Sequence, residues 1–167
     1  MPTKGKTKGN TGELKIAKFL TTLFESQFMR VPNSGAQIGG SNRNRRNLMD
    51  DGQIAMFKSD IIPPSHMQHL VIESKFYGDF PFHKLGTDHR IAQLDKWIDQ
   101  TLVTVDKGDI WFVVVRINHK GSFVLFDSQW QPQFVINNYA RYFEHTWCEF
   151  EPFFTANKQK ILELSAS

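Results

Sequence analysis

An eight-residue segment, Leu70–Tyr77, constrains the fold of this chain more than any other. Its sequence, LVIESKFY, follows a Pro-Pro turn and is rich in β-branched and aromatic residues, which predicts a β-strand. The first three residues are apolar, so we expect burial on both faces, as in the middle of a sheet. Alternation along a strand then places Glu73 and Lys75 on one face and Ser74 on the other.

A second short strand, predicted at residues 59–62, brings another acid to the same place. A hairpin-like return would put Asp60 beside Glu73, and charged groups are rarely buried without a partner or a metal ion. Two carboxylates suit Mg²⁺, and Lys75 would then orient a water molecule and stabilise a phosphate undergoing cleavage. The alternative is an ordinary Glu-Lys pair on a half-exposed strand, with Asp60 as a turn residue.

Asp60 followed by Glu73-Ser74-Lys75 at the end of an apolar strand resembles the PD-(D/E)XK nuclease motif. The residue before Asp60 is Ser59, where the motif has proline, and this is a mild departure because many members keep only the aspartate.

Three further segments are similar to the Holliday junction resolvases of archaeal and phage type. They are Gly12-Glu13 at the start of an amphipathic helix, the segment RVPNSG at residues 30–35, and Gln93 on a later helix. The resemblance covers about residues 12 to 127 and implies an α/β, restriction-endonuclease-like core with a mixed sheet of about five strands flanked by helices.

The resemblance also implies site residues and partners. Its catalytic residues would be Glu13, Ser34, Asp60, Glu73, Lys75 and Gln93. Its metal ligands would be Glu13, Asp60, Glu73 and Ser74, holding Mg²⁺, for which Mn²⁺ would substitute. The substrate would be a four-way DNA junction, and a homodimer would supply the two active sites that symmetric resolution needs.

Local explanations exist for two of these residues. We expect a helix over residues 11–27 with Thr11 as its cap, and Glu13 in its first turn would then serve only to cap it. A second helix is expected over residues 90–105, with Leu102 on its buried face, and Gln93 there is equally well a surface residue.

Basic residues are concentrated at the start of the chain. Residues 1–49 contain nine Lys or Arg and two acids, so they carry +7, whereas the whole chain carries +3. This asymmetry is typical of a polyanion-binding protein, although a solvated surface would explain it equally well. Candidate DNA-binding residues are Lys4, Lys6 and Lys8 in a flexible arm (residues 1–11), together with Arg30, Arg43, Arg45 and Arg46.

The remainder of the chain is expected to complete one domain, residues 12–167. Strands are predicted at residues 110–115 and 122–127, followed by an irregular, aromatic-rich stretch and a terminal helix after Pro152. Residues 128–167 would be a dimer surface, a substrate wedge or additional core. Phe80 and Phe82 would either stack on unpaired bases or cap the core.

Two general features bear on location and function. The single cysteine, Cys148, excludes an internal disulfide and favours a reducing cytoplasm, which would be the host's if the chain is phage-encoded. No apolar run approaches the ~20 residues of a membrane span. Alternatives to a junction resolvase are a nuclease of the same fold that acts on linear duplex DNA and a non-catalytic DNA-binding protein.

Overall fold

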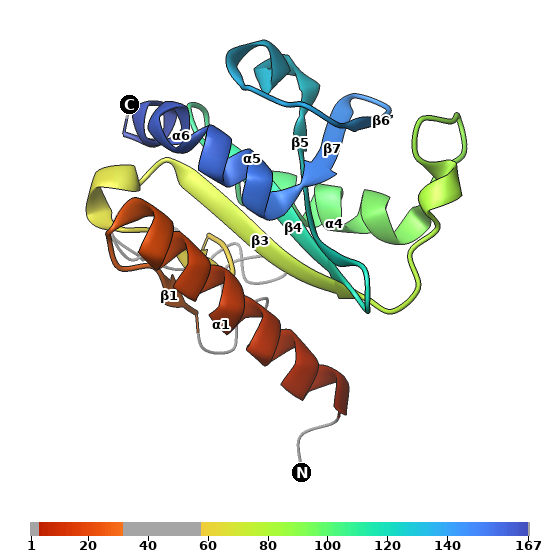
Figure 1. Ribbon diagram of the computed structural model, residues 1–167, viewed down its shortest axis with the longest axis horizontal. Coiled ribbons are helices and arrows are strands. Elements are labelled where there is room, and N and C mark those ends of the chain that lie inside the picture. Colours follow the sequence, from red (N-terminus) through yellow and green to blue (C-terminus); the bar gives the residue numbers. More distant parts are fainter. Residues whose placement is uncertain (1–3, 32–57, 167) are drawn as a thin grey trace.

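The fold is built on a mixed sheet. The computed structural model describes residues 4–31 and 58–166, with the backbone alone described for residues 4–10. Within these residues seven strands lie in the order β1-β2-β3-β4-β5-β7-β6 (Figure 1). Their bounds are β1 Met29–Arg30, β2 Ile61–Ile62, β3 Leu70–Tyr77, β4 Ile110–Ile117, β5 Gly121–Asp127, β6 Ala140–Tyr142 and β7 His145–Glu149. The pair β3 and β4 is parallel, and the other neighbouring strands are antiparallel.

Helices cover both faces of the sheet. On one face lie α1 (Lys4–Phe24), α5 (Phe150–Ala156) and α6 (Lys158–Ser165), and on the other lies α4 (Ala92–Leu102), which connects the parallel strands (Figure 1). Short 3₁₀ turns occur at Ser65–Met67, Phe82–Lys84 and Ser128–Gln133. The expected α/β class and mixed sheet are therefore confirmed, with more strands than the five expected.

The additional strands come from the stretch that we expected to be irregular. β7 pairs with β5 from Phe123↔Glu149 to Asp127↔His145, and β6 pairs with β7 at the edge of the sheet. β7 contains three consecutive buried residues, Thr146, Trp147 and Cys148, so the strand is covered on both faces. The sequence of β7, HTWCE, is short and has no alternation of apolar and polar residues, so no local pattern indicated a strand.

The N-terminal prediction was wrong in its boundaries. α1 begins at Lys4, so residues 4–10, which we expected in a flexible arm, form its first turns, and Thr11 is not a cap. The helix ends at Phe24 because Glu25 adopts a left-handed backbone conformation with φ of 55°. The helix predicted over residues 90–105 is shorter than expected, since α4 spans Ala92–Leu102.

Aromatic residues from the last forty positions form part of the core. Phe153 and Phe154 pack against Phe112 of β4, with ring centroids 5.8 and 5.1 Å away. On the opposite face, Phe80 stacks on Trp147 at 4.7 Å and is buried, so it belongs to the core. Leu102, predicted to be buried, is 47% exposed, and Thr101 takes the buried position on α4.

None of the helices in the described ranges has the length and apolar character needed to cross a membrane.

Candidate active site

The pairing of β2 with β3 brings the first two acids together. Ile61 lies opposite Ile72 in this antiparallel pair, which places Asp60 next to Glu73 as the sequence predicted. Asp60 is 5% exposed, and its Oδ2 accepts a 2.9 Å hydrogen bond from the backbone N–H of Ser74. Its own carbonyl oxygen accepts a hydrogen bond of the same length from the N–H of Val31. The carboxylate is therefore held at a defined position on the edge of the buried sheet.

Lys75 is the cation shared by these two acids. Its Nζ donates a 2.5 Å hydrogen bond to Oε1 of Glu73 and lies 3.9 Å from Oδ2 of Asp60. Glu73 and Lys75 are two positions apart on β3, so their side chains leave the strand on the same face. The predicted convergence of Asp60, Glu73 and Lys75 is thus present, and Asp60 and Glu73 do not point to opposite sides of the sheet.

Burial and mutual repulsion change the acid–base properties of this group. Burial, and next the negative charge of Asp60, raise the pKa of Glu73 to about 7. Burial alone would lower the pKa of Lys75, but the charges of Glu73 and Asp60 outweigh it and raise that pKa. Lys75 therefore remains an ammonium ion at neutral pH, where it can act as a hydrogen-bond donor and electrostatic stabiliser but not as a base.

Glu13 joins the group from α1. It lies in the third turn of a helix that starts at Lys4, so the capping interpretation is wrong. Its Oε2 accepts a hydrogen bond from Nε of Arg30 on β1. Burial raises the pKa of Glu13, with the charge of Asp60 adding to the increase, while the hydrogen bond from Arg30 opposes it. Glu13 is thus near enough to Asp60 for their charges to interact. We call Glu13, Arg30, Asp60, Glu73 and Lys75 the acidic site.

A second ion-pair cluster anchors the chain just before Asp60. Lys58 Nζ lies 2.8 Å from Oδ2 of Asp109 and 2.7 Å from Oδ2 of Asp106, both in the turn that leads into β4. His69 Nδ1 lies 3.0 Å from the other carboxylate oxygen of Asp109, whose side chain is 1% exposed. Sequence reasoning missed this cluster, because its basic members are 40 to 51 positions from Asp109 and match no local pattern.

The acidic site fits a hard divalent cation. Among the described residues, no group of three or more His, Cys, Asp or Glu side chains is arranged to hold a metal ion. Mg²⁺, however, is usually bound by one or two carboxylates and keeps several waters. Asp60 and Glu73 provide such a pair, and burial, followed by the charge of Asp60, raises the pKa of Glu73 despite the neighbouring Lys75. Glu13 does not form a three-acid ligand group with them. The backbone N–H of Ser74 donates to Asp60, and a role for an oxygen atom of Ser74 as a metal ligand stays a prediction.

The structure gives fewer contacts for the other predicted catalytic and DNA-binding residues. Gln93 is half-buried on α4, and within the described part of the chain no hydrogen bond joins it to the three acids. Ser34, Arg43, Arg45 and Arg46 lie outside the described residues. The three N-terminal lysines lie on the first turns of α1, where the backbone alone is described; they are Lys4, Lys6 and Lys8.

Comparisons with known proteins agree with this geometry. Residues 4–163 match the family described as "Phage putative PDDEXK endonuclease". Neither the search of curated proteins nor the search of solved structures found a match. The family match spans nearly the whole chain and includes Asp60, Glu73 and Lys75. The chain therefore belongs to the phage PDDEXK endonuclease family, within the PD-(D/E)XK nuclease superfamily.

Proposed function

We propose that the protein is a metal-dependent endonuclease that cleaves branched DNA, in particular four-way junctions, as a homodimer. The observation that carries the proposal is the convergence of Asp60, Glu73 and Lys75 at one buried edge of the sheet. Family membership supports the nuclease activity, and the order of the resolvase-like segments along the chain supports the junction as substrate.

Each side chain of the acidic site has a distinct role in this proposal. Asp60 and Glu73 bind Mg²⁺, which Mn²⁺ can replace. The ion supplies positive charge at the phosphate and makes water a better nucleophile. Lys75 donates a hydrogen bond toward the phosphate and stabilises the negative charge that builds up during cleavage. Glu13, held by Arg30, adds negative potential near the metal ligands.

Two cuts are needed to resolve a junction symmetrically, and a two-fold dimer provides two acidic sites for them. This part of the proposal rests on the chemistry of the substrate. Sedimentation of the protein alone and of its complex with a junction would measure how many chains bind one junction. A single chain per junction would contradict it.

The decisive experiment compares a labelled four-way junction with a linear duplex of matched sequence, each with Mg²⁺, with Mn²⁺ and with a chelator. We expect cleavage of the junction that depends on metal and is lost in Asp60→Asn and Glu73→Gln, two substitutions that preserve side-chain shape. Binding to the junction in chelator should remain, because neither substitution removes a positive charge.

Exposed acids provide matched controls. Asp88 and Glu25 have side chains that are 97% and 82% exposed, and Asp88→Asn and Glu25→Gln should cleave as the wild type does. Preference for the linear duplex would keep the nuclease activity and reject the junction as substrate. Normal cleavage by Glu73→Gln would reject the site, and intact DNA under every metal condition would indicate a non-catalytic binder.

A further inference from the structure

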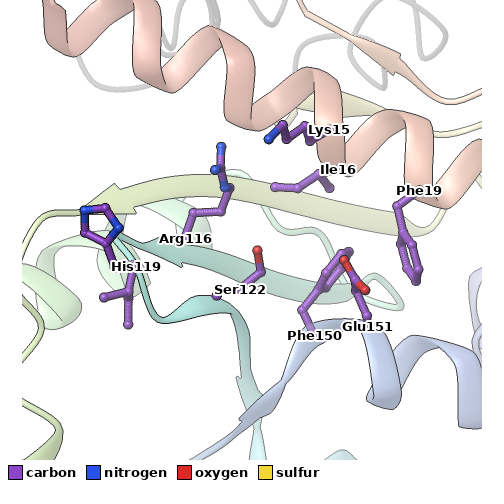
Figure 2. Close-up of a pocket in the computed structure, with 10 residues that line it drawn as sticks. Lys15, Ile16, Phe19, Arg116, His119, Ser122, Phe150 and Glu151 are labelled. Atoms are coloured by element: carbon purple, nitrogen blue, oxygen red, sulfur yellow. The ribbon is translucent and has the colours of Figure 1, made fainter.

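A second polar pocket lies beside α1, on the side of β4 and β5. It has a volume of about 280 Å³ and is bounded by α1, by the β4–β5 hairpin and by the start of α5. Figure 2 shows four of its polar residues gathered toward one end; these are Lys15, Arg116, His119 and Ser122. We call this group the Arg116 pocket. Its volume is at the small end of ligand sites, so it has room for a small polar group.

Arg116 is the central residue of this pocket. It lies on β4, is half-buried, and within the described part of the chain its guanidinium makes no hydrogen bond or ion pair. Arginine side chains that leave bulk water are normally paired, because an unpaired charge loses hydration without compensation. An external anion would supply the missing partner.

The neighbouring side chains favour an anion. Lys15 leaves α1 with its amino end directed toward the guanidinium of Arg116 (Figure 2). Two cations that face each other repel, and an anion between them offsets this repulsion because it attracts both. The hydroxyl of Ser122 adds a neutral hydrogen-bond donor from β5. The one acid of the pocket, Glu151, is at the opposite end, beside Phe150 (Figure 2).

Backbone features bring these groups close together. At Gly12, a Cβ atom would lie 3.0 Å from Nη1 of Arg116, so the absence of a side chain lets the guanidinium approach the helix. His119 has φ of 58° in the tight turn between β4 and β5, a left-handed conformation that few residues other than glycine adopt. This turn projects the imidazole toward the same end of the pocket as Arg116.

We propose that the Arg116 pocket binds a phosphate group. Arginine presents a planar set of donors that matches phosphate oxygens, and lysine adds a point charge. The phosphate comes either from the backbone of a DNA strand or from the terminus of one. The two sites share α1, because Glu13 of the acidic site is the neighbour in sequence of Gly12, where the guanidinium of Arg116 approaches the helix. Assigning the phosphate to the nuclease substrate rests on the proposed function, whereas binding of phosphate itself does not.

The test measures binding in chelator, where no cleavage occurs. Titration of the protein with inorganic phosphate, followed by ³¹P NMR or calorimetry, should show one site per chain. Arg116→Met keeps an apolar stem of similar length and should weaken binding about tenfold or more, because charge-assisted hydrogen bonds are lost. Lys96→Met, on the exposed side of α4, removes one charge from the opposite face of the sheet and should leave binding unchanged.

Two further variants separate binding from folding. Gly12→Ala improves helix propensity and should not lower the melting temperature, but its Cβ displaces the guanidinium and should weaken phosphate binding about threefold. Glu151→Gln removes the pocket's one acid and should tighten phosphate binding because it removes a negative charge. The expected change is only about twofold, since Glu151 is exposed and its charge is screened by water. Equal affinity for phosphate in the wild type, Arg116→Met and Gly12→Ala, or no binding by the wild type at millimolar phosphate, would overturn the proposal.

Two oligonucleotides identify the source of the phosphate. One carries internal phosphates only, and the other has the same sequence with a 5′-phosphate. If Arg116→Met weakens binding of both equally, the pocket takes a backbone phosphate, and if it weakens only the second, the pocket takes a terminal one. If neither is affected, the pocket does not contact DNA. If Arg116→Met binds both oligonucleotides as the wild type does and the protein still cleaves DNA in a metal-dependent way, the pocket's role in DNA binding is rejected and the proposed nuclease activity is retained.

Discussion

The acidic site and the Arg116 pocket treat charge in opposite ways. In the acidic site, cations and acids are paired within the chain, with Lys75 bonded to Glu73 and Arg30 to Glu13. In the Arg116 pocket, Arg116 and Lys15 face each other, and among the described residues neither forms an ion pair (Figure 2). The first site is built around acids and the second around bases.

Cleavage of a phosphodiester requires both a bound cation and a site for the phosphate anion, and the two sites differ in which of these they suit. The acidic site attracts a cation and keeps its geometry through internal hydrogen bonds, so changes there should affect both chemistry and stability. The Arg116 pocket depends on an external anion, so changes there should affect binding and leave the fold intact. The predictions below test this separation, beginning with the largest expected effect.

Removing the ammonium group from the acidic site should cause the largest loss. Lys75→Met should lower the rate of metal-dependent cleavage by about 10²- to 10³-fold, as loss of one electrostatic donor does in other active sites. Single-turnover cleavage with saturating protein measures this rate independently of binding. Lys96→Met is the matched control, because Lys96 is exposed on α4. An unchanged single-turnover rate in Lys75→Met would show that Lys75 only holds Glu73 in place.

The acidic site should also make stability depend on pH when no metal is bound. The folded pKa of Glu73 is about 7 against an ordinary value of 4.5, so the folded chain binds more protons than the unfolded chain between these values. Protonated Glu73 therefore stabilises the fold below pH 4.5, and this stability is lost as the pH rises through 7. The total is roughly 3 kcal/mol from the size of the shift.

Urea unfolding of the wild type and Glu73→Gln in chelator would measure this dependence. Glutamine does not titrate, so the difference in unfolding free energy between the two proteins should change in favour of Glu73→Gln as the pH rises. Mg²⁺ should stabilise the wild type most at high pH, where Glu73 is ionised. A constant difference across this range would mean that Glu73 is not coupled to Asp60 and burial as described.

The anchoring cluster next to the acidic site should contribute to stability. Lys58→Met removes the cation that pairs with the buried carboxylate of Asp109, which then keeps His69 and the N–H of Asp106 as partners. We expect the free energy of unfolding to fall by roughly 2–3 kcal/mol, because a buried charge loses its main partner. Lys107→Met changes an exposed lysine in the same turn and should alter it little. Equal losses in both variants would contradict the anchoring role.

Short-range patterns predicted the central part of the acidic site. The strand Leu70–Tyr77 has the bounds that its composition indicated, and a return of the chain from residues 59–62 placed Asp60 beside Glu73. These contacts follow from period-two alternation and one short antiparallel pair, which are local properties of the sequence. The partner of Glu13 was not predictable in this way, because Arg30 reaches it from another element.

The regions predicted incorrectly are those whose structure does not follow from a local sequence pattern. Residues 4–10 contain two glycines and three lysines, a poor helical sequence, yet they form the start of α1 and extend it toward the N-terminus from the expected start at residue 11. β7 exists because β5 offers an edge for pairing, and nothing within residues 145–149 requires a strand. The Arg116 pocket joins α1 to a hairpin about one hundred positions later, which no spacing rule connects.

The smallest expected effect is also the sharpest test of the comparison between the acidic site and the Arg116 pocket. Each phosphate neutralised by a protein cation adds about 0.9 to the slope of log binding constant against log salt for duplex DNA. Arg116→Met should lower this slope by about one at all sequences, whereas Glu73→Gln should leave it unchanged. Fluorescence anisotropy with a labelled junction in chelator, from about 50 to 200 mM salt, measures both. An unchanged slope in Arg116→Met would separate the pocket from DNA, because a guanidinium that releases no counterion does not contact a phosphate.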